Sequence, residues 1–362
     1  MARLGDIFTI TSGGTPDKKK SEYYANGTIP WVKTGDLKNQ YVPTGIECIT
    51  EEGLKNSSAK LFPPNTVLVA MYGATIGACS ILPYEASTNQ ACAAFLPNEK
   101  VMPTYLYYFL SSKKEQFIKD GVGGAQPNVS AGYLKNVQFD LIPMQQQINM
   151  VSTLDKVSEL FALRKEQLAK LDQLIKSRFI ELFGDPITNS NNLPTERMEL
   201  RFNLKAGITT AADDIHEFEE GMYEIPCYGG NGIRGYVREK SYTGNYPIIG
   251  RQGALCGNVQ YATGEFHATE HAVLVSLLKN DNSVWVYHLL KLMDLFRYHT
   301  GAAQPGLAVK TLNTVEVIVA DKRKQDQFAA FVEQTDKSKL AIQQSLDKLE
   351  LLKKSLMQEY FG

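Results

Sequence analysis

At 362 residues, the chain is long enough for two or three domains that each bury their own core. Its 38 lysines and arginines nearly balance 39 aspartates and glutamates, which argues against a protein that holds nucleic acid by itself, because counterion release from a basic surface drives much of such binding. No apolar run approaches the roughly 20 residues of a membrane span, and the first residues lack a signal-peptide core, so we expect a cytoplasmic protein with no membrane partner.

The first third of the chain predicts a mixed sheet with one helix. Short segments of apolar, small or β-branched residues occupy positions 66–72, 77–82 and 90–96 and are separated by glycine or proline, as strands are. Pro103 begins a predicted helix that continues to about Lys119, and a further strand is predicted at 137–142.

After Pro143 the pattern becomes that of a long helix. Apolar residues recur at alternating three- and four-residue steps, and Arg164 and Arg178 interrupt them. The positions of this seam are Leu154, Val157, Phe161, Leu168, Leu171, Ile175 and Leu182. A seam this broken predicts a helix that is stable only when packed on a partner.

The remaining sequence repeats this order. Strands are predicted at 246–250, 257–261 and 272–278, then a helix from about Ser283 to His299 and a strand at 315–319. A second long helix follows, whose seam consists of Val332, Ile342, Leu346, Leu349, Leu356 and Tyr360, with interruptions at Thr335, Lys339 and Lys353.

An internal duplication underlies this order. A shift of 178 positions places residues 125–127 on 303–305 and residues 170–184 on 348–362 without a gap. Upstream, the shift is 180 for Gly73 and Gly253, and 181 for the pairs Thr88 with Thr269 and Ala91 with Ala272. Two similar modules, each followed by a long helix, predict a pseudo-twofold repeat.

The two helices are expected to pair with each other in antiparallel fashion; the alternative is a helix that lies on its own module. Each would be about 55 Å long at ~1.5 Å per residue, whereas the connector over 185–196 reaches at most roughly 40 Å. The predicted fold is therefore α+β, with two mixed α/β domains and a long antiparallel two-helix coiled coil. The expected boundaries are domain 1 at 1–145, helix 1 at 146–184, domain 2 at 185–322 and helix 2 at 323–362.

Catalytic signatures are largely missing: there is no Walker A, GxGxxG, Gly-x-Ser-x-Gly or His-Glu-x-x-His sequence. His267 and His271 stand near Glu265 and Glu270, but the context is loop and strand, so polar surface is favoured over a metal site. The five cysteines contain no CxxC pair, which indicates buried thiols. We therefore predict no catalytic residue and no metal site.

Polar loops are the better candidates for function. Glycines at Ser12-Gly13-Gly14-Thr15 and in 228–236 would let a partner approach the backbone closely, although ordinary turns also explain such runs. Basic residues cluster in both copies, as DNA contacts or as solvated surface: Lys18, Lys19, Lys20, Lys33 and Lys38 in the first, Arg234, Arg238, Lys240 and Arg251 in the second. Acidic residues collect around Asp213, Asp214, Glu217, Glu219 and Glu220.

Across essentially its whole length, the chain resembles the specificity subunits of type I restriction–modification systems. The arrangement of two modules alternating with two helices carries most of the likeness. The matching motifs are Leu4-Gly5-Asp6, Ser12-Gly13-Gly14-Thr15-Pro16, Ile29-Pro30-Trp31-Val32-Lys33, Gly35-Asp36-Leu37, Ile142-Pro143, Gln147-Ile148, Leu154-Asp155, Tyr228-Gly229-Gly230-Asn231-Gly232 and Ile249-Gly250-Arg251-Gln252-Gly253. One departure is Val319-Ala320-Asp321-Lys322, which lacks the proline found at Pro143 and leaves the start of the second helix open.

The resemblance implies a non-catalytic subunit that reads double-stranded DNA. Each module would contact one half of a bipartite, asymmetric sequence, and the helices would set the spacer and dock two methyltransferase subunits. Restriction subunits would complete the complex. S-adenosylmethionine, ATP and Mg would be bound by these partners, and this chain would need no cofactor.

The DNA-binding residues expected from the resemblance and the loops fall into four groups. Lys33, Arg234 and Arg251 would pair with phosphate or guanine. Gln126, Asn128, Asn231, Gln252 and Gln304 would read base edges or support the loops, and Tyr72 and Tyr228 would stack or pack. Backbone and side chains of the first loop complete the set: Ser12, Gly13, Gly14 and Thr15.

Two alternatives remain open from the sequence. The chain would serve equally as the recognition subunit of a type IIB/IIG-like restriction enzyme, which uses the same modules with another catalytic partner. A scaffold or inhibitor that has lost DNA reading is the alternative from a different class, and the varied loops argue against it.

Overall fold

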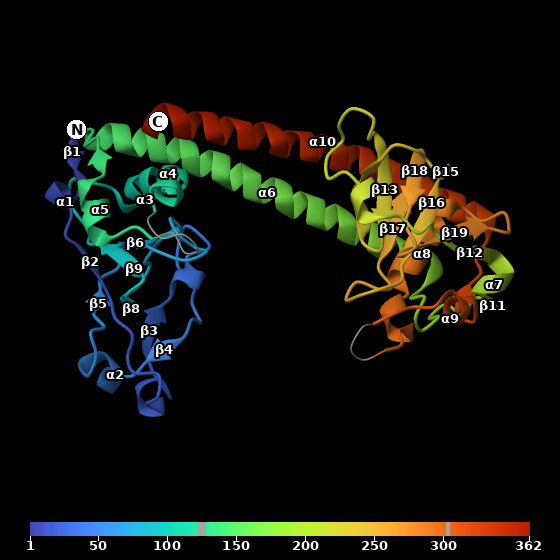
Figure 1. Ribbon diagram of the computed structural model, residues 1–362, viewed down its shortest axis with the longest axis horizontal. Helices are drawn as coiled ribbons and strands as arrows, with labels where there is room; N and C mark the ends of the chain where they lie inside the picture. The colour runs from blue at the N-terminus through green and yellow to red at the C-terminus, as the bar shows by residue number, and fades with distance from the viewer. Residues whose placement is uncertain (122–127, 302–304) are drawn as a thin grey trace. The chain divides into compact units, whose positions relative to one another are not determined.

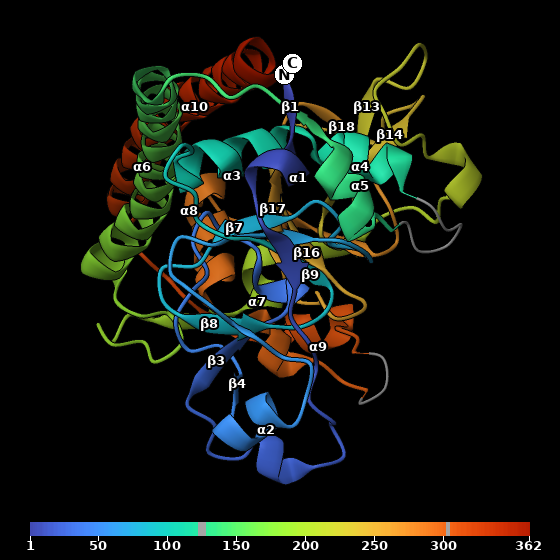
Figure 2. The same ribbon diagram turned by 90° about the vertical axis from the view of Figure 1, so that its left-hand side faces the viewer.

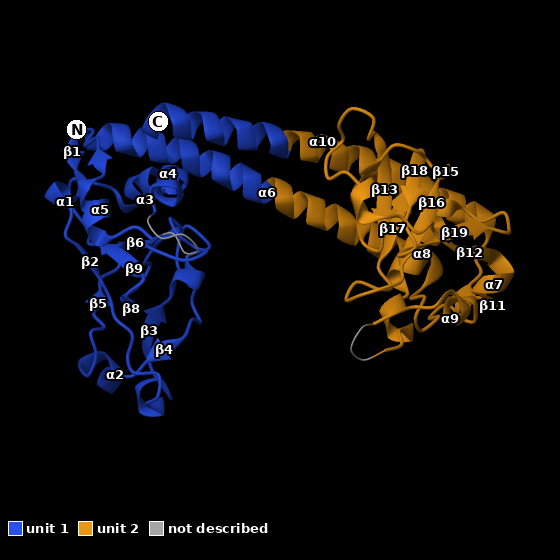
Figure 3. Cartoon of the chain, viewed as in Figure 1, with its two compact units in different colours: residues 1–163, 346–362 blue, residues 164–345 orange. Residues whose placement is uncertain are grey.

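The computed structural model describes residues 1–121, 128–301 and 305–362. They form two compact units, each considered by itself: unit 1 is Met1–Leu163 with Leu346–Gly362, and unit 2 is Arg164–Ser345 (Figure 3). The long helices α6 (Met144–Phe183) and α10 (Lys322–Phe361) each lie partly in unit 1 and partly in unit 2.

Unit 1 contains two four-stranded sheets and a two-stranded ribbon (Figure 1). The first sheet is antiparallel in the order β2 (Ile10–Ser12), β9 (Cys92–Phe95), β6 (Val67–Ala70) and β7 (Cys79–Ile81). The second is mixed in the order β4 (Cys48–Ile49), β3 (Ile29–Val32), β8 (Ala86–Thr88) and β5 (Leu61–Phe62). The ribbon pairs β1 (Ala2–Arg3) with β10 (Gln138–Phe139).

The strands of the first sheet are buried on both faces. Val67 and Val69 of β6 belong to a core that includes α3 (Pro103–Ser112), whereas Leu68 and Ala70 belong to a second core shared with β3, β5 and β8. Because successive strand residues point to opposite faces, this double burial explains the continuous apolar runs. Figure 2 shows α3 on one side of this sheet and the second sheet on the other.

The other helices of unit 1 are short. They are α1 (Leu4–Ile7), α2 (Glu51–Lys55), α4 (Lys114–Asp120) and α5 (Ala131–Asn136), with 3₁₀ turns at Ser21–Tyr23 and Thr34–Asp36. The helix predicted from Pro103 to Lys119 is therefore divided at Lys113 into α3 and α4.

Unit 2 repeats unit 1 strand for strand. Its first sheet has the order β12 (Phe202–Ala206), β19 (Ala272–Leu277), β16 (Tyr246–Gly250) and β17 (Val259–Ala262). Its second sheet has the order β14 (Gly232–Val237), β13 (Ile225–Gly229), β18 (Glu265–Ala268) and β15 (Tyr242–Thr243), and its ribbon joins β11 (Thr195–Arg197) to β20 (Glu316–Ile318). This shared strand order confirms the predicted internal repeat.

The helices of unit 2 also have counterparts in unit 1. They are α7 (Met198–Arg201), α8 (Ser283–Leu292) and α9 (Val309–Asn313), with 3₁₀ turns at Ala212–Asp214 and Leu295–Tyr298. The helix predicted to reach His299 ends earlier, and Asp294 follows it in the left-handed region with φ of 49°.

Strand pairing corrects one detail of the sequence alignment. Thr88 pairs with Val32, and the residue in the same place of unit 2 is Ala268, which pairs with Tyr228. The shift between the two units is thus 180 along these strands, and the alignment of Thr88 with Thr269 and of Ala91 with Ala272 is wrong by one residue.

In each unit, one end of each long helix packs into the core. In unit 1, the Phe361 ring lies 5.4 Å from Tyr105 and 6.1 Å from Phe109, and its carbonyl accepts a hydrogen bond of 2.6 Å from Lys113 Nζ. In unit 2, Phe183 lies 5.7 Å from Trp285 and 5.9 Å from Phe328. Phe183 and Phe361 correspond to each other at the shift of 178. The two units therefore also share the way in which an aromatic residue anchors the end of a long helix in the core.

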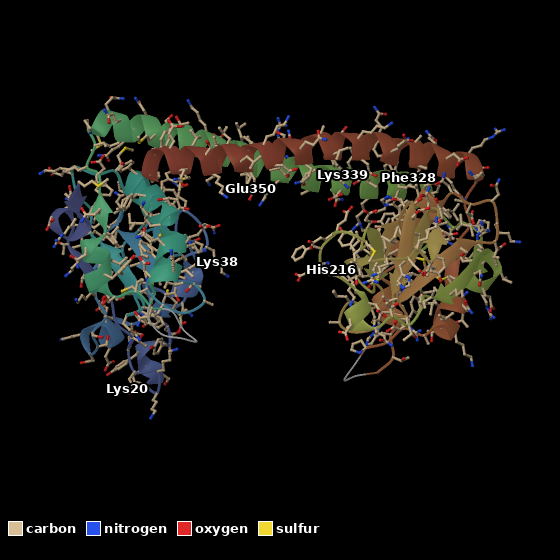
Figure 4. All side chains as sticks on the ribbon, turned by 45° about the horizontal axis from the view of Figure 1, so that its top comes forward. Lys20, Lys38, His216, Phe328, Lys339 and Glu350 are labelled. Carbon is tan, nitrogen blue, oxygen red and sulfur yellow. The ribbon has the colours of Figure 1, made fainter. Side chains whose placement is uncertain are left out.

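Both units show antiparallel packing of the helices. In unit 1 the start of α6 meets the end of α10, where Lys353 Nζ donates to Ser158 Oγ at 3.0 Å. In unit 2 the end of α6 meets the start of α10, where Lys339 (labelled in Figure 4) pairs through Nζ with Asp172 at 2.7 Å. Two of the lysines that interrupt the seam thus have polar partners on the facing helix. The predicted antiparallel pair is confirmed.

The start of the second helix has a local cause. Asp321 takes the place of Pro143, and its Oδ1 accepts hydrogen bonds from the amides of Arg323 and Lys324 at 3.0 and 3.3 Å. A side chain that accepts from the first-turn amides is an N-cap. The capping aspartate therefore replaces the proline that precedes α6.

The cysteines lie mostly in the cores. Cys79, Cys92, Cys227 and Cys256 are buried and Cys48 is half-buried, which confirms the predicted buried thiols at four positions. Burial raises the pKa of Cys79 to about 12. Within the described ranges, no helix combines the length and apolar character needed to cross a bilayer.

Burial of His288 predicts a loss of stability in acid. Its ring packs 5.3 Å from Phe328, and burial, then Lys291 and Lys339, lower its pKa to about 3. The unfolded chain, with an ordinary histidine pKa near 6.5, binds more protons between these values, so stability falls as pH drops through this window. We expect His288 to account for about 2 kcal/mol between pH 8 and pH 5.

Urea unfolding at several pH values measures this effect. H288Q should show a smaller loss between pH 8 and pH 5 than the wild type, whereas H299Q, outside the helix contact, should match the wild type. Equal pH profiles for H288Q and wild type, or an NMR titration that protonates His288 near pH 6.5, would contradict the prediction.

Candidate nucleic-acid interface

In unit 1, polar side chains meet at one edge of the first sheet, where β2 and β6 end and β9 begins. Thr15 Oγ1 donates a hydrogen bond to Gln90 Oε1, and Tyr72 forms an isolated antiparallel bridge with Asn128. Burial raises the pKa of Tyr72, and a hydrogen bond with Gln90 opposes this rise. The edge thus joins Thr15, Tyr72 and Asn128 of the predicted set around Gln90.

The predicted glycine loop has a packing role. A Cβ atom at Gly13 would overlap the Thr88 carbonyl, and one at Gly14 would overlap Ser58. Gly14 also donates to Thr88 O at 2.9 Å and accepts from Trp31 Nε1 at 3.0 Å. Both glycines are buried, which argues against direct DNA contact, whereas Ser12 and Thr15 remain partly exposed.

The loop at 12–16 and the loop at 228–232 are not counterparts. Gly13 corresponds to Gly207, since an added Cβ there would overlap Ala268 O, the equivalent of Thr88 O. The second loop instead connects β13 to β14. The two glycine-rich runs therefore present polar groups from different strands.

Lys33 has an internal partner. Its Nζ lies 2.6 Å from Glu47 Oε2, and both side chains are about two-fifths exposed, at 41% and 42%. The hydrogen bond to Glu47 raises the Lys33 pKa, so Lys33 stays charged. To bind DNA, its ammonium group would leave Glu47 and pair with a phosphate. Such exposed pairs contribute only ~0–1 kcal/mol.

In unit 2, the predicted residues line a cavity of about 450 Å³. Its wall consists of Gly229, Gly230, Asn231, Arg234, Gln252, Gly253, Ala254, Leu255 and His271. Gln252 stands where Tyr72 stands in unit 1, because Gln252 bridges Gly306 as Tyr72 bridges Asn128. The cavity brings together three predicted residues, Asn231, Arg234 and Gln252, which the sequence places on two loops.

The polar groups of the cavity differ in how firmly they are held. Asn231 Oδ1 accepts from Asn258 Nδ2, and His271 Nε2 lies 3.1 Å from Glu270 Oε1. Arg234 is exposed on β14, and in the described part of the chain no carboxylate lies within 4.0 Å of it. Guanidinium and amide groups suit hydrogen bonding to base edges in the major groove.

Two predicted contacts of unit 2, Tyr228 and Arg251, are half-buried. Arg251 occupies the place of buried Met71. The Met71 amide donates to the carbonyl of Ala91, just before β9, and the Arg251 amide donates to the carbonyl of His271, just before β19. The Nε atom of Arg251 is buried without an acceptor among the described residues. Tyr228 packs edge-on against Phe266 at 5.6 Å, and burial raises its pKa. Tyr228 thus packs on Phe266, one of its two predicted roles, and both Tyr228 and Arg251 stay partly exposed.

The remaining predictions concern Gln126, Gln304 and the two histidines near Glu265 and Glu270. Gln126 and Gln304 lie outside the described residues. His267 is hydrogen-bonded on both ring nitrogens, by Thr210 Oγ1 at 2.8 Å and by Ser241 Oγ, and burial lowers its pKa. Over 1–121, 128–301 and 305–362, no group of three or more histidine, cysteine or acidic side chains is placed to hold a metal.

Sequence reasoning missed Gln90, Glu47, Asn258 and His271 as members of the two sites. Gln90 and His271 lie between strands that the repeat aligns, at positions where the copies differ. Polar residues that differ between the two aligned copies could have indicated these positions. The alignment at a shift of 181, where the strands give 180, obscured this signal.

Comparison with known proteins agrees with this arrangement. The model of the type I restriction modification DNA specificity domain matches residues 1–173 and 202–352, one stretch for each copy. The specificity subunit of the type I restriction enzyme EcoprrI of Escherichia coli is 33% identical over 360 residues, which cover 92% of this chain and 86% of the relative. The MjaIX specificity subunit of Methanocaldococcus jannaschii is 30% identical over 190 residues, 51% of this chain and 44% of the relative.

Solved structures share the fold. The S subunit of a type I restriction–modification system from M. genitalium matches with a TM-score of 0.60 at 17% identity, over 99% of this chain and 95% of that chain. A chain from a structural study of complex assembly in the type I R-M system matches with a TM-score of 0.64 at 16% identity, over 99% and 96%. By its sequence and its two-copy architecture, this chain belongs to the type I restriction–modification DNA specificity family.

Proposed function

We propose that this chain is the DNA-recognition subunit of a type I restriction–modification complex and that each unit reads one half of a bipartite, asymmetric site. One observation carries the proposal. The two units share the same strand order, yet corresponding positions at the sheet edge hold different residues: Tyr72 and Gln252, Gln90 and Glu270, Asn128 and Gly306. One fold that presents different side chains in its two copies suits the recognition of two different DNA half-sites.

The chemistry of the two edges supports different half-sites. Unit 1 offers hydroxyl and amide groups from Thr15, Gln90 and Asn128. Unit 2 offers the Arg234 guanidinium, the Gln252 amide and the His271 ring. Amide side chains pair well with adenine and guanidinium with guanine, so the two edges favour different base pairs and the whole site is asymmetric.

The proposal assigns catalysis to partners. Two methyltransferase subunits would dock on α6 and α10, with S-adenosylmethionine, and restriction subunits would bring ATP and Mg. The near-zero net charge supports shared holding of the duplex. Support also comes from the E. coli relative, which is described as the specificity subunit of a restriction enzyme.

Methyl transfer by purified components tests this division of labour. We expect the isolated chain to transfer no methyl group from S-adenosylmethionine to DNA, and its complex with the methyltransferase subunits to methylate a bipartite motif. The matched control is the methyltransferase without this chain, which should show no such motif. Methyl transfer by the isolated chain would contradict the proposal.

A further inference from the structure

The connection that leads from the first sheet to the second carries opposite charge in the two units. In unit 1, residues 13–28 join β2 to β3 and include Lys18, Lys19 and Lys20 with only two acidic residues. In unit 2, residues 207–224 join β12 to β13 and include six acidic residues and no lysine or arginine. A DNA backbone would be attracted to the first connection and repelled by the second.

The three lysines are free to bind an anion. All are exposed, and in the described ranges no carboxylate lies within 4.0 Å of their ammonium groups, unlike Lys33, which has Glu47. Lys20 Nζ instead donates to Tyr23 OH at 2.9 Å, and Figure 4 shows the Lys20 side chain projecting away from the body of unit 1. Within the described ranges, their positive charges are therefore not neutralised by ion pairs.

The loop that bears these lysines is firmly anchored. Tyr23 is buried, and its carbonyl accepts from Thr50 N at 2.9 Å. Tyr24 OH donates to Pro16 O at 2.6 Å, and its ring packs edge-on to Trp31 at 5.9 Å. An anchored loop loses little conformational entropy when its side chains meet a phosphate.

The acidic connection of unit 2 is also held in place. His216 and Tyr236 exchange backbone hydrogen bonds of 2.8 and 2.7 Å, and the His216 ring stacks on Tyr223 at 5.0 Å. The carboxylate side chains of Glu217, Glu219 and Glu220 are left exposed. The two connections therefore differ in charge, whereas both are held in place by hydrogen bonds and ring packing.

We propose that Lys18, Lys19 and Lys20 bind the phosphodiester backbone of duplex DNA, and that the acidic connection of unit 2 stays off the duplex. The inference rests on the proposed function. The connection at 13–28 then contributes salt-dependent, sequence-independent affinity that the connection at 207–224 does not.

The salt dependence of binding tests this proposal. The complex with the methyltransferase subunits is titrated with a duplex that carries the methylated motif, over roughly 50 to 200 mM salt. K18Q/K19Q/K20Q should lower the slope of log K against log salt by about 2 to 3, at ~0.9 for each phosphate contact. K18R/K19R/K20R keeps the charge and should retain the wild-type slope, and E217Q/E219Q/E220Q should leave it unchanged.

An unchanged slope in K18Q/K19Q/K20Q would overturn the lysine contact, and an altered slope in E217Q/E219Q/E220Q would overturn the placement of the acidic connection. The methylated motif separates this inference from the proposed function. The glutamine variant should keep the wild-type motif, whereas a wild-type complex that methylates no bipartite motif would defeat the proposed function itself.

Discussion

Replacing Asp281 by alanine is expected to lower the free energy of unfolding of unit 2 by about 3–5 kcal/mol. Arg201 Nε and Nη2 donate to its two oxygens at 2.6–3.0 Å, and Gln325 Nε2 donates to Oδ1 at 2.9 Å. The Asp281 and Arg201 side chains are only 3% and 9% exposed. Removal of the carboxylate leaves a buried guanidinium with Glu196 alone, at 3.2 Å, as its acidic partner.

Unit 1 provides the matched control. By strand and helix register, Ile7 and Val101 occupy the places of Arg201 and Asp281, so the same frame also accepts an apolar pair. R201I/D281V should therefore be less destabilised than D281V alone, because no charge is left unpaired. Trp285, the tryptophan of unit 2, reports its unfolding in a W31F background. A loss below about 1 kcal/mol for D281A would show that the pair is not buried in solution.

Cutting the chain after Gly184 is expected to produce a dimer. The fragment loses residues 346–362, whose Phe361 fills the space beside Tyr105 and Phe109, and exposes the apolar seam of α6. Each fragment still carries Phe183, the repeat of Phe361, at its own end. A second copy can therefore supply the missing helix, and burial at roughly 25 cal/mol per Å² favours this exchange.

Light scattering measures the assembly, and F183A is the informative variant. It should weaken dimerisation, whereas I187A in the full chain, a change just outside the helix, should have no effect on its mass. With methyltransferase partners, the fragment dimer should methylate an inverted repeat of the first half-site. A fragment that is monomeric at high concentration would count against the helix pairing.

The sequence predicted the parts of the fold whose signal is local. Strands β6, β9, β16 and β19 are buried on both faces and therefore appear as apolar runs. The two long helices were predicted from the spacing of the apolar residues in their seams. The second sheet of each unit was missed for two reasons. Three of its strands, β4, β5 and β15, are only two residues long, and Pro30 and Pro226 weaken the strand pattern of β3 and β13.

The candidate site was predictable in kind but not in full membership. Thr15 and Tyr72 were found on loops, yet Gln90, which links them, is 75 positions from Thr15. Arg251 was assigned to DNA because its charge is visible in the sequence, whereas the burial of its Nε, and of Met71 at the corresponding position, appears only in the structure. Which loop residues touch each other depends on tertiary contacts that no local pattern carries.

Methylation-sensitive sequencing of DNA modified by the complex tests the central claim that each unit reads its own half-site. Q90A in unit 1 and Q252A in unit 2 remove one amide each from corresponding edges. A base contact is worth ~1–3 kcal/mol of discrimination, so we expect Q90A to relax or change one half of the methylated motif and Q252A to affect only the other half. A single substitution that alters both halves alike would contradict the account, because it would mean that the two units form one composite site.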